Sequence, residues 1–253
     1  MINNDLNNLP LQLKFRRFEF KYQLPLFLID RIISDLLDYM EWDPFVIDRA
    51  DKSYQVSSLY FDSAGLGCYH EKLAGVKKRK KFRLRTYATA LEPLTKVFIE
   101  IKRKDDMAIL KDRLVIDYQS HFSFLTNGQP NFAPHQMSAQ EKEVLKEFLW
   151  TKNHNCLMPK IMVIYKRQPL ISRLDHRFRI TFDSHLQAHP ANRLSFSDRK
   201  TEIFPDQAVM ELKYNNIIPS WFHHLIQKYQ LDRRPFSKYC RSLAGCYKNH
   251  QYV

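Results

Sequence analysis

The sequence predicts an α+β fold: a closed antiparallel β-barrel (tunnel) of about eight strands, with helices packed on its outside. In eight short segments charged or polar residues alternate with apolar ones, which is the period of side chains along a strand. The polar sides are mostly cationic, whereas the other sides carry large Phe, Leu and Ile residues that need a covering layer. A barrel with its polar side chains inside meets both requirements. Cations crowded in such an interior are stabilised by a bound polyanion.

The segment KKFRLRTY (80–87) shows the alternation most clearly, because Lys81, Arg83 and Arg85 share one face. A half-buried sheet with its polar face in water would explain any one such segment. The recurrence of cations over the whole set favours the closed interior. The other segments are RFEFKYQL (17–24), YQVSSLYFD (54–62), KVFIEIKRK (96–104), ILKDRLVIDY (109–118), KIMVIYKRQ (160–168), HRFRITFD (176–183) and VMELKY (209–214).

Four segments have helical signals and would cover the outside of the barrel. Residues 25–40 begin with Pro25 and repeat Leu and Ile at a spacing of four. Residues 138–150 open with Ser138 and Glu141, a capping box. We expect two more helices over 219–230 and 237–247, and a surface connection over 120–137. No change of composition divides the chain, so we expect a single domain over 1–253 with its core at about 17–247.

Composition indicates the kind of partner. The chain has 253 residues and a net charge of +13, which predicts an anionic ligand. It contains 5 glycines and no glycine-rich phosphate loop, so side chains must bind any phosphate. The sequence shows no signal peptide and no membrane-spanning segment, and its four cysteines have no zinc spacing. A reduced, cytoplasmic location is the simplest interpretation.

The order of the motifs resembles the catalytic domain of the vacuolar transporter chaperone (VTC) family of polyphosphate polymerases, within the triphosphate tunnel metalloenzyme superfamily. The similar pieces span residues 17–247 and are RFEFKYQL, SSLYFDS followed by CYHEKL, FRLRTY, FIEIKRK, KDRL, YKRQPL, RITFD, MELKY and PFSKYCRSL. The resemblance implies a closed tunnel in which basic residues bind triphosphate or polyphosphate and an acidic residue holds Mn²⁺ or Mg²⁺.

The resemblance also assigns residues. The catalytic, phosphate-binding set comprises Lys21, Arg83, Arg85, Lys102, Arg167 and Arg179. Further phosphate contacts are expected from Lys72, Lys111, Arg113, Tyr165, Lys213, Ser237 and Lys238, of which Lys72 stands where the family has an Arg. Glu211 is the expected principal metal ligand. Glu19 and Glu100 are either additional ligands or counter-charges for the cations.

Phosphoryl transfer chiefly needs alignment and neutralisation of charge, and these residue types supply both. The leading hypothesis is a metal-dependent polymerase that transfers the terminal phosphate of ATP onto polyphosphate. Hydrolysis of tripolyphosphate or a nucleoside triphosphate is a second hypothesis, and a non-catalytic polyphosphate-binding module is a third. A nucleic-acid binder would also suit the net charge, but no nucleic-acid-binding motif is present and alternating cations suit an interior better than an exposed groove, so no nucleic acid is expected as a partner.

Overall fold

The sheet that carries the alternating residues contains ten strands, all paired antiparallel. A computed structural model describes residues 18–105, 108–127, 137–215 and 217–248. The strand order is β1-β10-β8-β7-β3-β4-β5-β6, with β2 paired to β7 and β9 to β8. The strands are β1 (Phe18–Pro25), β2 (Met40–Trp42), β3 (Tyr54–Asp62), β4 (Lys78–Thr86), β5 (Lys96–Asp105), β6 (Ala108–Asp117), β7 (Met158–Ser172), β8 (Arg179–Pro190), β9 (Thr201–Glu202) and β10 (Gln207–Tyr214).

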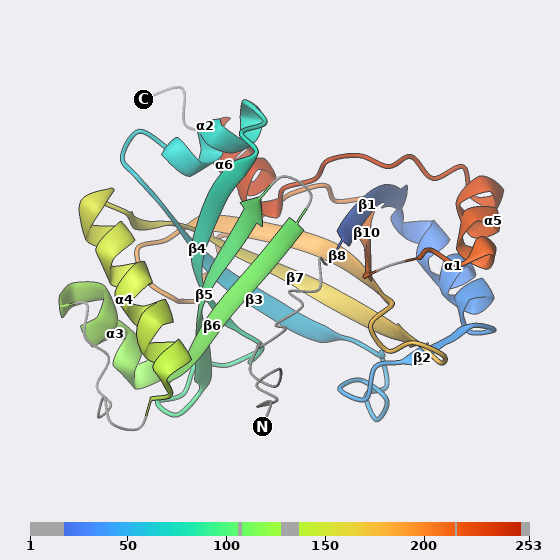
Figure 1. Cartoon of the computed structure of the whole chain (residues 1–253), viewed down its shortest axis with the longest axis horizontal. Coiled ribbons are helices and arrows are strands. Elements are labelled where there is room, and N and C mark those ends of the chain that lie inside the picture. The colour runs from blue at the N-terminus through green and yellow to red at the C-terminus, as the bar shows by residue number, and fades with distance from the viewer. Residues whose placement is uncertain (1–17, 106–107, 128–136, 216, 249–253) are drawn as a thin grey trace, which may run out of the picture.

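The sheet is strongly curved but is not hydrogen-bonded into a closed barrel. Figure 1 shows β4, β5 and β6 lying in front of β3, β7 and β8, so that the sheet folds back over itself. The two ends of the strand order, β1 and β6, approach within 8 Å between Cα atoms. Within the described residues, no backbone ladder joins them. The expected closed tunnel is therefore corrected to an open, folded sheet with a seam between β1 and β6.

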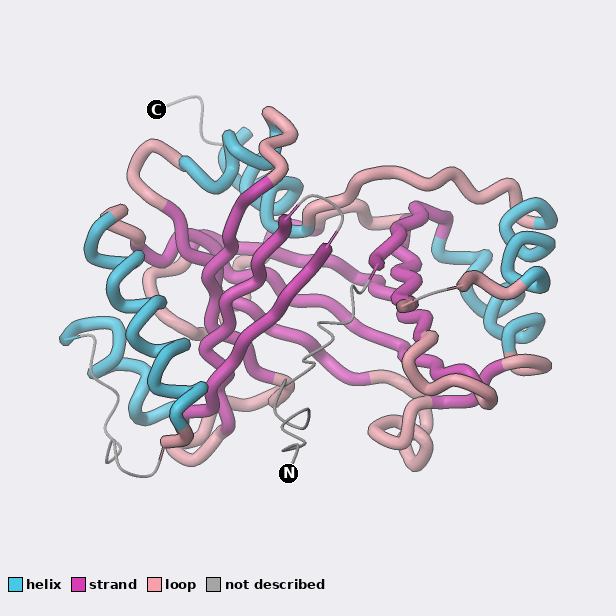
Figure 2. The backbone as a smooth tube through the Cα atoms, in the orientation of Figure 1, coloured by secondary structure: helices cyan, strands magenta, loops and turns pink. Residues whose placement is uncertain are grey.

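Helices cover both faces of this sheet. The helices are α1 (Ile29–Leu36), which follows the short 3₁₀ turn Leu26–Leu28, α2 (Gly67–Leu73), α3 (Tyr118–Asn127), α4 (Ala139–His154), α5 (Ser220–Lys228) and α6 (Lys238–Lys248). As Figure 2 shows, α3 and α4 lie at one side of the strands and α1 and α5 at the other. These two pairs cover the apolar outer face, where Leu84, Ile99 and Phe148 form one core and Met210, Leu212 and Phe222 another.

Helix α6 packs on the opposite, concave face. Its residues Tyr239, Cys240 and Leu243 contact a third apolar core that includes Ile161 and Val163 of β7. The concave face is therefore apolar where α6 lies and charged beside it. This arrangement places the first residue of α6, Lys238, next to the charged part.

Several expected elements are confirmed and others are shifted. Ser138 and Glu141 form the expected capping box of α4, which runs four residues beyond the predicted end. The segment 120–137 is not simply a connection, because residues up to Asn127 belong to α3; residues 128–136 lie outside the described residues. The helix expected over 25–40 ends at Leu36, since Met40 begins β2.

No helix among the described residues combines the length and the apolar character that a membrane crossing requires.

Candidate functional site

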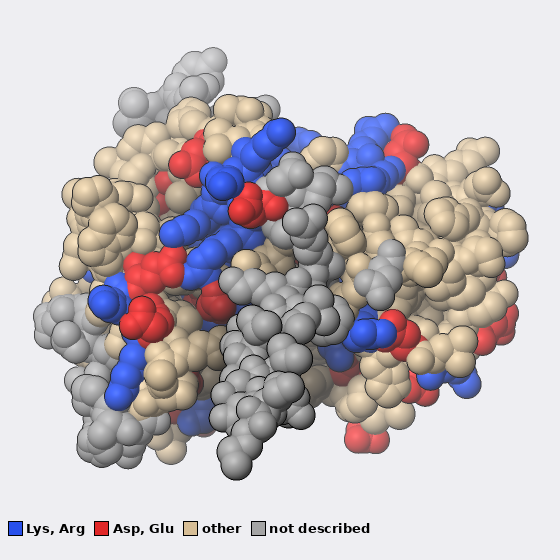
Figure 3. Space-filling view, in the orientation of Figure 1, with Lys and Arg blue, Asp and Glu red and all other residues tan. Residues whose placement is uncertain are grey.

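The concave face of the sheet holds a cavity of about 890 Å³. Fourteen Lys and Arg side chains line it, against the two carboxylates Glu19 and Glu211. Figure 3 shows Lys and Arg gathered where β4, β5 and β6 face the viewer. So large an excess of positive charge in a hollow favours a ligand with several negative charges.

The first charged network surrounds Glu100 on β5. This carboxylate is fully buried, and it accepts hydrogen bonds from Arg83 Nε at 2.7 Å and pairs with Lys111 Nζ at 2.6 Å and Arg85 Nε at 3.7 Å. Burial alone would raise the pKa of Glu100, but the charges of Arg83, Arg85 and Lys111 hold that pKa well below its ordinary value. Glu100 is thus ionised behind the cavity wall and fixes the guanidinium groups in front of it.

Hydroxyl groups of β3 complete the positioning of these two arginines. Arg83 Nη1 donates to Tyr60 Oη at 3.1 Å, and Arg85 Nε donates to Ser58 Oγ at 3.0 Å. The strand register places Tyr60 opposite Arg83 and Ser58 opposite Arg85. These fixed partners set the orientation of both guanidinium groups, and therefore the direction of the N–H donors that remain unused.

The second network surrounds Glu211 on β10. Its Oε1 lies 3.0 Å from Lys21 Nζ and 2.9 Å from Lys238 Nζ, while its Oε2 lies 3.5 Å from Arg167 Nη2 and 3.6 Å from Lys213 Nζ. Burial opposes ionisation, but the four cations hold the pKa of Glu211 well below its ordinary value. One carboxylate thus gathers cations from β1, β7, β10 and α6.

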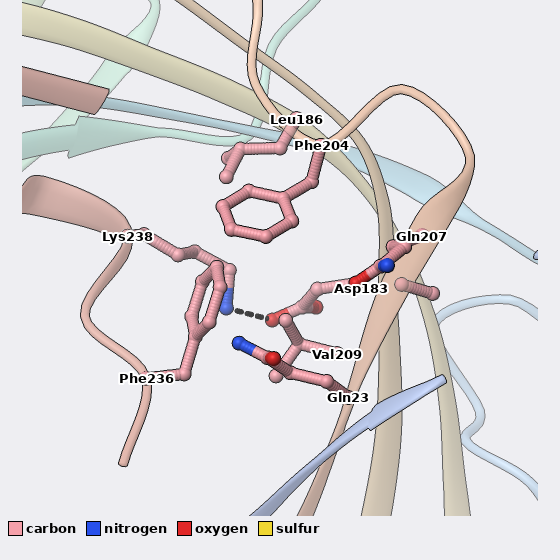
Figure 4. A pocket seen from close by; sticks show the side chains of 9 residues that line it. Gln23, Asp183, Leu186, Phe204, Gln207, Val209, Phe236 and Lys238 are labelled. Carbon is pink, nitrogen blue, oxygen red and sulfur yellow. Dashed lines mark ion pairs between the residues drawn. The ribbon is translucent and has the colours of Figure 1, made fainter. Parts of the chain in front are cut away.

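Asp183 on β8 supports the same network from behind. It accepts two hydrogen bonds from Arg167, at 2.6 and 2.7 Å, and its Oδ2 lies 2.5 Å from Lys238 Nζ. Figure 4 shows the Lys238–Asp183 pair beside a small hollow of about 10 Å³ that Phe204, Phe236 and Val209 help to line. This hollow is too small for a substrate, so the chemistry belongs to the large cavity.

Three lysines of the cavity have a pKa well below the ordinary value for lysine. Burial and neighbouring cations lower the pKa of Lys111 to about 7 and the pKa values of Lys81 and Lys213 to about 8. Lys81 Nζ donates to Ser237 Oγ at 2.8 Å, at the start of α6. An entering anion would favour the protonated lysines, which is the electrostatic signature of an anion site.

The carboxylates present fit a divalent cation of the Mg²⁺ or Mn²⁺ kind. Within the described ranges no group of three or more His, Cys, Asp or Glu side chains is assembled for a metal. However, Glu19 and Glu211 both contact the one ammonium of Lys21, at 3.1 and 3.0 Å. Mg²⁺ commonly binds through one or two carboxylates together with substrate phosphates and water. Glu19 and Glu211 are therefore the candidate ligands, whereas Glu100 serves Arg83, Arg85 and Lys111.

Most of the residues expected from the sequence line the cavity. They are Glu19, Lys21, Lys72, Arg83, Arg85, Lys102, Lys111, Tyr165, Arg167, Glu211, Lys213, Ser237 and Lys238. Arg179, Arg113 and Glu100 do not, and Glu100 is fully buried behind the cavity wall. Arg179 is the first residue of β8, and its guanidinium donates to the His176 carbonyl at 3.0 Å and lies 3.7 Å from Asp43. Arg113 is exposed and lies over the ring of Phe98, at 5.1 Å.

Other lining residues were not assigned from the sequence. Lys81 shares the strand phase of Arg83 and Arg85, so the alternation alone was enough to predict that it lines the cavity. Tyr87 and Lys104 follow the alternation of their strands and Arg79 continues that of β4, but none of the three was given a role. Arg233 and Arg234 come from a loop, where alternation gives no signal. Nothing in one sequence indicates that Tyr60 and Asp183 position arginines.

The curved antiparallel sheet gathers cations around ionised carboxylates on its concave face, which is an arrangement suited to a ligand with several negative charges. The VTC domain model matches residues 16–247, so the chain belongs to the VTC domain family. Among curated proteins no significant match is found.

Solved structures share the fold at low sequence identity. One is described as a candidate adenylate cyclase from Bacillus halodurans; it is 11% identical with a TM-score of 0.53, over 88% of this chain and 94% of that one. Another, from Hippeastrum, is described as a candidate adenylyl cyclase with a dominant triphosphatase activity; it is 14% identical with a TM-score of 0.49, over 91% of this chain and 96% of that one. These similarities concern the fold.

Proposed function

We propose that this protein transfers the terminal phosphate of ATP onto a polyphosphate chain bound in the cavity, with Mn²⁺ or Mg²⁺ as cofactor. The observation that carries the proposal is the convergence of the cations of two networks on one cavity, with Glu211 ionised among them. Such a site neutralises several phosphate groups in a row and leaves a carboxylate available for a divalent ion.

In the proposed reaction a terminal oxygen of the polyphosphate attacks the γ-phosphorus of ATP. The bond from that phosphorus to the β–γ bridging oxygen breaks, and ADP leaves with the electron pair. Arg83 and Arg85, held by Glu100, would stabilise charge on the transferred group. Lys21, Arg167 and Lys238 would hold the neighbouring phosphates in line. Glu211 and Glu19 would hold the divalent ion, which would neutralise phosphate charge.

The experiment is incubation of the purified chain with ATP and Mn²⁺, followed by separation of the products by chain length. Polyphosphate together with ADP supports the proposal. ADP with orthophosphate alone would replace it by hydrolysis. Tight binding without any turnover would leave a polyphosphate-binding module.

Two variants locate the activity in the cavity. Arg85→Ala removes a guanidinium of the first network and should lower turnover by about 100-fold, the scale of losing one transition-state contact. Arg177→Ala is the matched control, because Arg177 is exposed and pairs locally with Asp175 at 2.9 Å. A loss of equal size in both variants would contradict the assignment of the cavity as the active site.

A comparison of anions distinguishes the cavity from an exposed basic surface. Tripolyphosphate should raise the melting temperature strongly, because it binds the folded state and fits between the walls. Double-stranded DNA should give a smaller effect that decreases steeply with salt. Equal stabilisation at about 0.15 M salt would favour a nucleic-acid surface instead.

A further inference from the structure

The inward-facing residues of β4 change in chemical character along the strand. Arg79, Lys81, Arg83 and Arg85 follow one another at a spacing of two, and Tyr87 takes the next place just after the strand ends. All five line the cavity. A row of four cations therefore ends in an aromatic ring.

The neighbouring antiparallel strand β5 shows the same change from cations to an aromatic ring, read in the opposite chain direction. In the register of the pair, Lys104 stands opposite Arg79 and Phe98 opposite Arg85. We call Arg79 and Lys104 the cationic end of the cavity. Along this pair of strands, charge and aromatic character are thus sorted by the strand register, while Phe18, Phe20, Phe236 and Tyr239 of other elements also line the cavity.

Three half-buried rings meet at the other end. The ring centroids of Tyr87 and Phe98 are 5.5 Å apart, and those of Tyr87 and Tyr54 are 5.6 Å apart. We call Tyr54, Tyr87 and Phe98 the aromatic end; Tyr87 lines the cavity, and the other two rings pack against it. The guanidinium of Arg113 lies over Phe98 and adds a flat cation to the group.

The other tyrosines of the cavity have a different environment. Arg83 lies over the ring of Tyr60, and Lys81 over that of Tyr239, each at 5.7 Å. Lys238 and Arg167 lie over Tyr165 at 4.7 and 5.4 Å. Each of these rings has a cation of the site over it, and those of Tyr60 and Tyr239 also contact each other at 5.3 Å. The ring of Tyr87 contacts the rings of Tyr54 and Phe98.

This polarity matches one class of ligand. An inorganic phosphate chain has no apolar part, so it gains nothing from an aromatic end. A nucleoside triphosphate has a flat base at one end and a row of negative charges at the other. Aromatic rings stack on any base, because every base has a π-face.

We propose that Tyr87, supported by Tyr54 and Phe98, binds the base of a nucleoside triphosphate whose phosphates extend towards the cationic end. The inference rests on the proposed function, in which a nucleotide is the phosphate donor. It adds the direction in which the donor lies and the residues that distinguish a nucleotide from inorganic tripolyphosphate. Stacking by Tyr87 predicts tolerance of the base, so ATP and GTP should bind alike.

The test is calorimetric binding of ATP and of tripolyphosphate to the full chain, without metal and therefore without turnover. Tyr87→Ala should raise the Kd for ATP by about tenfold, the scale of losing one stacked base. It should change the Kd for tripolyphosphate by less than about twofold, because no cation is removed. Tyr87→Phe should keep the wild-type affinities, and Tyr247→Ala, an exposed tyrosine of α6, is the matched control.

The outcomes separate this inference from the proposed function. Equal Kd changes for both ligands in Tyr87→Ala, or no change for either, would overturn the base site and leave the phosphate site intact. Wild-type protein that binds tripolyphosphate but not ATP would overturn both the base site and ATP as the phosphate donor. Failure of the wild type to bind either ligand would instead overturn the proposed function.

Discussion

Lys102 on β5 and Glu19 on β1 form an ion pair across the open seam of the sheet, with Lys102 Nζ 3.0 Å from Glu19 Oε2. Backbone hydrogen bonds do not connect these two strands in the described part of the chain. Side chains therefore hold the folded sheet together at this place. The same two residues line the cavity, so closure of the seam and binding of the ligand share their atoms.

Removing one partner of the seam pair should destabilise the protein more than removing both. Glu19→Gln should lower the free energy of unfolding by about 2 kcal/mol, because it leaves buried cations with less counter-charge. Lys102→Met in the same chain should restore part of the loss, with a coupling energy of about 1 kcal/mol in a double-mutant cycle. Urea unfolding measures both values. The exposed pair of Lys228 with Asp35 is the control, and Asp35→Asn should cost less than about 1 kcal/mol. Strict additivity at Glu19 and Lys102 would contradict a role in closure.

Glu211→Gln should separate binding from turnover. The change keeps the size of the side chain and removes the charge that four cations contact. Metal-free binding of tripolyphosphate should stay the same or become tighter, since one negative charge leaves the cavity. Turnover with Mn²⁺ should fall by about 100-fold or more, equivalent to about 3 kcal/mol of transition-state stabilisation. Normal metal-dependent turnover in this variant would move the metal role to Glu19.

Because of Lys81, the free energy of unfolding of the ligand-free protein should increase at alkaline pH. Burial, with the charges of Lys102 and Lys21, lowers the pKa of Lys81 from 10.5 to about 8, although Cys240 and Tyr60 act in the opposite direction. Below about pH 8 the folded chain carries the full cost of this charged lysine. Between about pH 8 and 10.5 the unfolded chain binds a proton that the folded chain lacks, so stability rises with pH.

The pH experiment compares unfolding at pH 8 and at pH 10 in the wild type, Lys81→Met and Lys81→Arg. Lys81→Met should remove the contribution of this group to the rise. Lys81→Arg stays charged at both values, so its affinity for tripolyphosphate should fall less between pH 8 and pH 10 than that of the wild type. The fall that remains belongs to Lys213, whose pKa is also about 8. An identical pH profile in all three proteins would show that Lys81 is protonated throughout.

Asp183→Asn should lower the stability of the fold, and a bound anion should restore part of that stability. The carboxylate holds Arg167 at 2.6 Å and Lys238 at 2.5 Å in a fully buried position. Its neutralisation should cost about 3 kcal/mol, because two buried cations lose a partner. Tripolyphosphate should raise the melting temperature of this variant more than that of the wild type, since the anion replaces the missing charge. An equal shift in both proteins would mean that Asp183 acts on the fold without acting on the site.

Alternation predicted the inner wall well because a strand has a period of exactly two residues and both faces here have strong chemical character. Lys21, Arg83, Arg85 and Lys102 line the cavity as their phase requires. Arg179 has the right phase but stands at the first residue of β8, where the preceding turn offers it His176 and Asp43. Alternation along a strand determines which face of the sheet a residue occupies, but it does not determine where a long side chain lies at the end of a strand.

Closure of the sheet could not be predicted from the pattern. The alternation of β1 and β6 is the same whether or not their backbones pair, because it records which face is buried. The role of Glu100 was left open for a related reason: a carboxylate among cations reads equally as a metal ligand or a counter-charge. Its three cationic contacts in the folded protein favour the second role.

The buried position of Glu100 has a consequence for release of the product. Cations without a protein carboxylate beside them would bind a phosphate polymer with very high affinity and release it slowly. Arg83, Arg85 and Lys111 instead remain attached to Glu100 from behind, so an incoming phosphate shares them with a resident partner. When the phosphate departs, these side chains still have a partner and need no rearrangement. In the proposed polymerase, the interior carboxylate would thereby moderate the affinity of the cavity and allow the polyphosphate to move along after each addition.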